Sequence, residues 1–223
     1  MPWIGAVSAV LEAWYPGIRG GEAIANILFG VVNPSAKLPV TFPKSEADLP
    51  HPKMFAPPGF TVGNFTTIAG QLPPFDIHYS EGAKAGYKWF DAEKKEPLFA
   101  FGFGLSYTTY SYSGLQTAAL QRPAVTFRVT NTGQRAGSET AQIYVSLPAA
   151  AGEQFRRLAA WEKVPLAPGE TKTVTLDLDP QFLSIFNTEK DAWELLPGEY
   201  KVYVGGSSRW TPLAGSMRLS GAQ

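Results

Sequence analysis

Hydrophobic and polar residues alternate strictly through the C-terminal half of this 223-residue chain. The alternation begins after Gly114 and recurs in four stretches: Val125, Phe127, Val129; Ile143, Val145, Leu147; Val174, Leu176, Leu178; Tyr200, Val202, Val204. A period of two is typical of β-strands that bury one face. Turn-forming residues separate the stretches, at Asn131-Thr132-Gly133, Pro168-Gly169 and Pro197-Gly198. The pattern therefore predicts an all-β antiparallel sandwich of about seven strands.

The N-terminal part of the chain has a helical pattern instead. Apolar residues three and four positions apart predict one amphipathic helix over residues 7–14, ended by Pro16-Gly17, with the apolar positions Val7, Val10, Leu11 and Trp14. A second helix is predicted around residues 23–28, closed by Gly30. Residues 37–42 predict a short strand bounded by prolines. We interpret this part as a fragment of an α/β layer, that is, a partial α/β sandwich.

Two segments between these parts lack a regular period. Prolines and glycines interrupt residues 43–74, which predicts an irregular loop or an extended wrapping segment. Residues 79–105 are rich in aromatic residues and in glycine, and this composition argues against a helix there. Asn64-Phe65-Thr66 is a formal N-glycosylation sequon.

Composition excludes several classes of function. The chain has 19 basic and 19 acidic residues and no Lys/Arg run, so a nucleic-acid-binding surface is not expected. It has no cysteine, which excludes disulfides and thiol catalysis but is compatible with a periplasmic or secreted protein. No Cys or His stands at a metal-ligand spacing from His51 or His78, so the sequence predicts no metal site, and no motif predicts a cofactor.

The N-terminus does not favour a targeting segment. Residues 1–13 are apolar enough for a signal peptide, but they lack a basic n-region, and their helical spacing favours a core helix. No apolar run approaches the roughly 18 residues that cross a bilayer, so no membrane anchor is predicted.

Several short sequence motifs of this chain occur in the order that is typical of one enzyme family. They are Leu11-Glu12-Ala13-Trp14-Tyr15-Pro16-Gly17, Gly20-Gly21-Glu22-Ala23, Asn33-Pro34-Ser35-Ala36-Lys37-Leu38-Pro39, Tyr79-Ser80-Glu81-Gly82, Gly86-Tyr87-Lys88-Trp89-Phe90-Asp91 and Glu96-Pro97-Leu98-Phe99-Ala100-Phe101-Gly102-Phe103-Gly104-Leu105-Ser106-Tyr107-Thr108. The chain resembles the C-terminal half of family 3 glycoside hydrolases, the β-glucosidase and β-xylosidase family. It departs from the family pattern at Ile18-Arg19, Ala36 and Ala160.

The resemblance implies an activity that these residues do not carry alone. Retaining glycosidases need two carboxyl groups roughly 5 to 5.5 Å apart, one as nucleophile and one as acid/base. In the family these come from a (β/α)8 barrel and from a loop of the sandwich domain, both upstream of the segment that matches Met1. We therefore assign no catalytic residue to this chain. The expected partner is the missing N-terminal barrel domain or a separately encoded catalytic chain, and an oligosaccharide or glycoside would bind only in the complete enzyme.

Four residues are candidates for contacts with substrate or between domains: Glu81, Tyr87, Trp89 and Asp91. Carboxylates beside aromatic rings suit sugars, whose apolar faces stack on such rings, and they suit a domain interface equally well. For Glu81 and Asp91 we favour structural roles in turns and loops, and for the aromatic residues we favour interdomain packing over direct substrate contact.

These observations predict two domains. Residues 1–113 are expected to be the C-terminal portion of the family 3 α/β sandwich domain, and residues 114–223 a fibronectin type III-like β-sandwich. The function that follows is the scaffold portion of a β-glucosidase-like enzyme. The alternative is a non-catalytic binding or stabilising module, acting by itself or complementing a separate catalytic chain.

Overall fold

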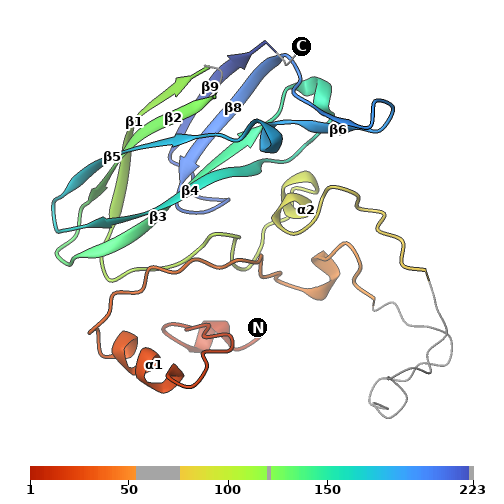
Figure 1. Cartoon of the computed structure of the whole chain (residues 1–223). Helices are drawn as coiled ribbons and strands as arrows, with labels where there is room; N and C mark the ends of the chain where they lie inside the picture. The colour runs from red at the N-terminus through yellow and green to blue at the C-terminus, as the bar shows by residue number, and fades with distance from the viewer. Residues whose placement is uncertain (54–75, 120–121, 221–223) are drawn as a thin grey trace.

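The computed structural model describes residues 1–53, 76–119 and 122–220. These residues form a β-sandwich and an N-terminal region that lies along one side of it (Figure 1). The predicted glycosylation sequon and much of the predicted 43–74 loop lie outside the described residues. None of the described helices is long and apolar enough to cross a membrane.

The sandwich consists of two antiparallel sheets in the described part of the chain. One has the strand order β1-β2-β5 and the other the order β4-β3-β8-β9. The strands are β1 (Tyr110–Ala118), β2 (Ala124–Asn131), β3 (Gly137–Ser146), β4 (Arg157–Leu166), β5 (Thr171–Asp177), β8 (Gly198–Gly205) and β9 (Leu213–Leu219). A short hairpin of β6 (Ile185–Asn187) and β7 (Ala192–Glu194) stands at one end. The prediction of an antiparallel sandwich is confirmed.

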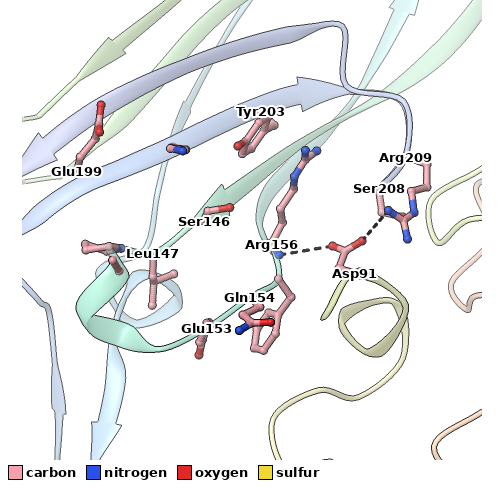
Figure 2. A pocket seen from close by; sticks show the side chains of 14 residues that line it. Asp91, Ser146, Leu147, Glu153, Gln154, Arg156, Glu199, Tyr203, Ser208 and Arg209 are labelled. Atoms are coloured by element: carbon pink, nitrogen blue, oxygen red, sulfur yellow. Dashed lines mark hydrogen bonds and ion pairs between the residues drawn. The ribbon is translucent and has the colours of Figure 1, made fainter. Parts of the chain in front are cut away.

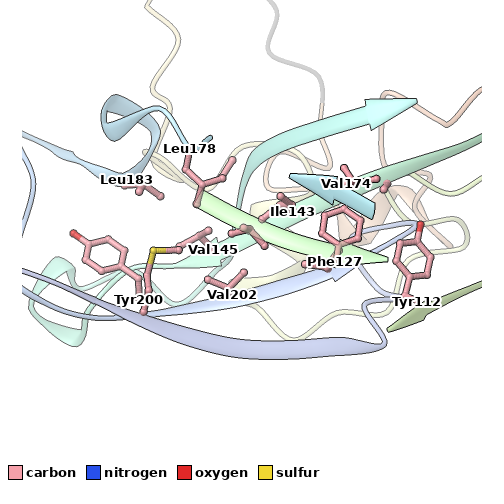
Figure 3. Close-up of a cluster of buried hydrophobic side chains, with 14 of the residues drawn as sticks. Tyr112, Phe127, Ile143, Val145, Val174, Leu178, Leu183, Tyr200 and Val202 are labelled. Atoms are coloured by element: carbon pink, nitrogen blue, oxygen red, sulfur yellow. The ribbon is translucent and has the colours of Figure 1, made fainter. Parts of the chain in front are cut away.

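The residues that alternate in the sequence form the core between the two sheets. Figure 3 shows side chains of both sheets meeting there, and the fully buried members include Val125, Phe127, Val129, Ile143, Val145, Tyr200, Val202 and Val204. On β2 and β5 the intervening residues face outward, where Thr126 pairs with Thr175 at 2.9 Å and Thr130 with Thr171 at 2.8 Å between hydroxyl oxygens. Burial of one face of each strand is what fixes the register of such sheets.

The predicted helix over residues 7–14 is wrong. Only Ile4–Ala6 form a short 3-10 turn, η1, and residues 7–14 have no helical structure. A helix this short depends on tertiary packing of its apolar face rather than on its own propensity. Within the described residues that packing is missing, because Val7, Val10, Leu11 and Trp14 are all exposed.

The second predicted helix is confirmed as α1 (Gly20–Leu28), and Gly30 ends it with a positive φ of 71°. The predicted strand over residues 37–42 is reduced to one bridge between Phe42 and Phe99, together with hydrogen bonds between Leu38 and residues 102 and 103. In the described residues only these separate hydrogen bonds join the segment to residues 98–103, so no continuous ladder forms.

The expectation that residues 79–105 contain no helix is wrong for six residues. Tyr87–Ala92 form the helix α2, which lies on the side of the N-terminal region that faces the sandwich (Figure 1). The helix starts directly after Gly86, which has a φ of 59°. Residues 87–92 themselves contain no glycine, so nothing in them interrupts the helix. A shorter 3-10 helix, η2 (Glu46–Asp48), precedes it and is capped by Ser45. In the sandwich, η4 (Ala149–Ala151) and η5 (Pro180–Leu183) are 3-10 turns between strands.

A buried charge joins the N-terminal region to the sandwich. The Glu139 carboxylate on β3 is 3% exposed and lies 3.2 Å from the Lys37 ammonium. It also accepts a hydrogen bond from the Tyr112 hydroxyl on β1 at 2.8 Å. Burial and then the Glu139 charge raise the pKa of Tyr112, so its hydroxyl stays protonated and donates. Gly104 passes so close to this segment that a Cβ there would lie 2.4 Å from the Ala36 carbonyl oxygen.

This junction yields a stability prediction. Lys37→Met leaves the buried Glu139 carboxylate without a counter-charge, so the free energy of unfolding should fall by about 3–5 kcal/mol. The double variant Lys37→Met/Glu139→Leu should recover much of that loss. The matched control is Lys172→Met, whose pair with Glu170 is exposed and should change stability by about 1 kcal/mol or less. Urea unfolding of the whole chain measures all three, and equal losses for Lys37→Met and Lys172→Met would contradict the assignment.

Candidate functional site

Tyr87 on α2 reaches the sandwich and is held there on three sides. Its ring stacks on Phe101 with centroids 4.7 Å apart and meets Tyr144 of β3 edge to face at 5.9 Å. Its hydroxyl oxygen accepts a hydrogen bond from the backbone N–H of Leu158 on β4 at 2.7 Å. Burial raises the pKa of Tyr87 to about 12. Tyr87 is therefore a neutral, packed residue of the seam between α2 and the four-stranded sheet.

Gln142 on β3 continues this seam. Its amide donates to the carbonyl oxygens of Gly102 at 3.1 Å and Gly206 at 2.7 Å, and it accepts from the Tyr144 hydroxyl at 2.5 Å. A Cβ on Gly102 would lie 2.1 Å from the Gln142 side-chain oxygen, and Gly102 has a φ of 78°. Glycine is required there for close approach as well as for its backbone conformation. Sequence reasoning missed Gln142, because its strand position is one that alternation assigns to the outer face.

Asp91 lies four residues after Tyr87 on α2 and is held by an arginine. Its carboxylate forms an ion pair with Arg209 at 3.2 Å and accepts a long hydrogen bond of 3.5 Å from the Arg156 backbone N–H. Arg209 also donates to the carbonyl oxygens of Phe90 and Lys95. Burial raises the pKa of Asp91, and the charge of Arg209 opposes that rise.

Trp89 faces the N-terminal region rather than the sandwich. Its indole N–H donates to the Asp48 carbonyl oxygen at 2.8 Å, which ties α2 to η2. The ammonium groups of Lys84 and Lys95 lie 5.1 and 5.6 Å from its ring centroid, within the range of cation–π attraction. Trp89 therefore holds two segments of the N-terminal region together.

Glu81 belongs to a third set of contacts. Its carboxylate lies 2.6 Å from the His51 ring nitrogen, and the ring of Tyr79 meets that of His51 edge to face. The backbone N–H of Glu81 lowers the pKa of its carboxyl group, and His51 adds to the effect. Of the four candidates, the structure brings Tyr87 and Asp91 together on one face of α2, while Trp89 and Glu81 have separate partners.

A pocket of about 680 Å³ opens beside Asp91, between α2 and the end of the four-stranded sheet. Figure 2 shows its wall: Ser146 and Leu147 at the end of β3, Glu153, Gln154 and Arg156 before β4, Glu199 and Tyr203 on β8, and Ser208 and Arg209 after β8. The Arg156 guanidinium lies over the Tyr203 ring at 3.7 Å and donates to the Thr211 hydroxyl at 3.1 Å. No sequence motif links these positions, because the fold alone brings them together.

In the described residues there is no group of three or more His, Asp or Glu side chains that would hold a metal ion. The pocket wall combines three carboxylates with three cationic side chains, and Asp91 is the one residue it shares with the sequence-based candidates.

Two family models match this chain. The glycosyl hydrolase family 3 C-terminal domain matches residues 1–107, and the fibronectin type III-like domain matches residues 139–208. Similar proteins include β-glucosidase B of Emericella nidulans, 37% identical over 94% of this chain and 25% of that protein, and a β-glucosidase of Rhizobium radiobacter, 40% identical over 93% and 25%. This chain therefore spans about a quarter of the length of these relatives.

Solved structures agree with the sequence comparison. A β-glucosidase of Bifidobacterium adolescentis matches with a TM-score of 0.84 and 34% identity, over 99% of this chain and 31% of that one. β-Glucosidase 3B of Thermotoga neapolitana matches with a TM-score of 0.83 and 35% identity, over 97% and 29%. The resemblance seen in the sequence is confirmed: this chain matches the C-terminal region of glycosyl hydrolase family 3 β-glucosidases, with the family's C-terminal domain at residues 1–107 and a fibronectin type III-like domain at residues 139–208.

Proposed function

We propose that this chain is the C-terminal scaffold of a β-glucosidase-like enzyme that hydrolyses terminal β-linked glycosides. The observation that carries the proposal is the extent of the match: nearly the whole chain aligns with β-glucosidases, over about a quarter of their length. In this proposal the nucleophile and the acid/base belong to a barrel-containing portion outside these 223 residues. The chain supplies packing, and the parent enzyme needs no metal or cofactor.

The local carboxylates support a scaffold role. A retaining glycosidase needs two carboxyl groups that act across one sugar. Glu81 is engaged by His51, and Asp91 by Arg209, in separate networks. We propose that Tyr87 and Asp91 fasten α2 to the sandwich, and that Glu81 and Trp89 fasten the segment around residues 46–51 to the rest of the N-terminal region. The domain boundary between residues 113 and 114 stays a prediction, and β1 begins at Tyr110.

The surface around α1 is the proposed docking face for the barrel-containing portion. Large apolar side chains there are strongly exposed: Tyr15, Ile18, Leu28, Phe29 and Val31. Gathered apolar side chains of this kind mark interfaces in soluble proteins. Because the relatives are about four times longer than the matched segment, we propose that the rest of such an enzyme covers this face.

The first functional prediction is that the isolated chain is inactive. Without a nucleophile and its partner the covalent route is unavailable, so aryl β-glucosides and β-xylosides should turn over no faster than in buffer. Release of the aryl group measures this. Turnover that Glu81→Gln or Asp91→Asn abolishes would instead make the local carboxylates catalytic.

The second prediction concerns docking. The chain should co-elute in size-exclusion chromatography with a separately produced portion of the Rhizobium radiobacter relative that ends before the matched segment and that, in this proposal, contains the barrel. Phe29→Asp places a charge in the docking face and should weaken this association by roughly tenfold or more. Phe186→Asp is the matched control, because this exposed phenylalanine lies on β6, at the opposite end of the molecule (Figure 1).

Two results would contradict the docking proposal. One is equal association of Phe29→Asp and Phe186→Asp with the barrel-containing portion. The other is a wild-type chain that elutes alone at every ratio of the two components, which favours the non-catalytic module instead.

The third prediction separates a packing role of Tyr87 from sugar contact. Tyr87→Phe keeps the ring stack but leaves the Leu158 N–H without its acceptor, so the free energy of unfolding should fall by about 1–3 kcal/mol. Tyr15→Phe is the control, because Tyr15 is 99% exposed and should be neutral. Urea unfolding measures both variants. Unchanged stability of Tyr87→Phe together with weaker glycoside binding would point to sugar contact.

A further inference from the structure

Many of the side chains that line the pocket beside Asp91 can donate or accept hydrogen bonds. Its volume of about 680 Å³ lies within the range of roughly 300–1,000 Å³ that is typical of small-molecule sites. Hydroxyl, amide, carboxylate and guanidinium groups line it, from three separate parts of the chain (Figure 2). An apolar ligand would leave these groups without partners, and buried polar groups without partners are costly.

Three of the six charged side chains of the wall are held in ion pairs. Arg209 pairs with Asp91, and Glu153 pairs with Arg157 just behind the wall. The whole lining has three acidic and three basic side chains. A multiply charged anion would meet the carboxylates, and a cation would meet the arginines. This balance favours an uncharged ligand that both donates and accepts hydrogen bonds.

The Arg156 side chain is already held in place in the pocket before any ligand binds. Its guanidinium carbon lies 3.7 Å from the centroid of the Tyr203 ring, and one of its nitrogens donates a hydrogen bond to the Thr211 hydroxyl at 3.1 Å. A planar fork held in this way costs little further conformational entropy when it binds a pair of oxygen atoms. Within the described part of the chain, the side chains of Ser146, Gln154 and Glu199 make no hydrogen bond and are available at the rim.

We propose that this pocket binds a neutral oligosaccharide, with Arg156 donating to two neighbouring hydroxyl oxygens and the rim residues Ser146, Gln154 and Glu199 bonding further hydroxyl groups. Neighbouring hydroxyl groups on a sugar ring are both donors and acceptors, which matches the mixed wall. The choice of β-linked glucose as the probe rests on the proposed function, whereas the preference for a neutral polyhydroxyl ligand rests on the wall itself.

The test titrates the whole chain with cellobiose and follows backbone amide signals by NMR. Saturable shifts are expected for residues 146–156 and 199–209, with a dissociation constant of about 1 mM or weaker. Arg156→Ala should weaken binding by roughly tenfold. Arg128→Ala, on the outer face of the other sheet, is the matched control and should leave binding unchanged. Gln154→Ala, at an exposed position, should weaken binding several-fold, and it keeps the test decisive should Arg156→Ala unfold.

Sodium glucuronate and inorganic phosphate are the competing probes. Tighter binding of either one, shifts scattered over other surfaces, or no saturation at the solubility limit of cellobiose would overturn the inference. The experiment needs no barrel-containing partner. Docking without cellobiose binding would therefore refute only this pocket assignment, and cellobiose binding without docking would refute only the scaffold proposal.

Discussion

The buried carboxylate of Glu139 joins the two parts of this structure. It stands on β3, inside the four-stranded sheet, and receives Lys37 from the N-terminal region and Tyr112 from the other sheet. A charge at this depth is tolerated only when it is paired and hydrogen-bonded. The cation, Lys37, comes from a segment with little regular structure. The Glu139 carboxylate inside the sandwich therefore has its counter-charge only when that segment is in place.

The same dependence extends along the four-stranded sheet. Gln142 on β3 bonds the Gly102 carbonyl, Tyr87 accepts from Leu158 on β4, and Arg209 after β8 holds Asp91. Each contact pairs a polar group of the sheet with one from the N-terminal region. These contacts are directional, so they specify where α2 stands. The pocket beside Asp91 results from that position, because α2 forms one of its walls.

The N-terminal region differs from the sandwich in how its apolar residues are used. In the sandwich, Phe127 and Val145 are fully buried between two sheets. Around α1, Ile18 and Phe29 are exposed although their side chains are as apolar as those of the core. Leaving such side chains in water forgoes about 1.5–3 kcal/mol each. This exposure supports the proposed docking face, as does the quarter-length match to the relatives.

The sequence by itself determined the sandwich, because a period of two with turn signals between strands buries one face whatever the surroundings. The sequence also indicated the family, through motifs such as those at residues 86–91 and 96–108. The tertiary structure alone decided the rest. Residues 7–14 have a helical pattern but no helix, since no described surface covers their apolar face. The pocket unites Asp91, Arg156 and Tyr203, which are far apart in sequence. Arg156 reaches Tyr203 within the sandwich, and Asp91 joins them because α2 packs against β3, β4 and the segment after β8.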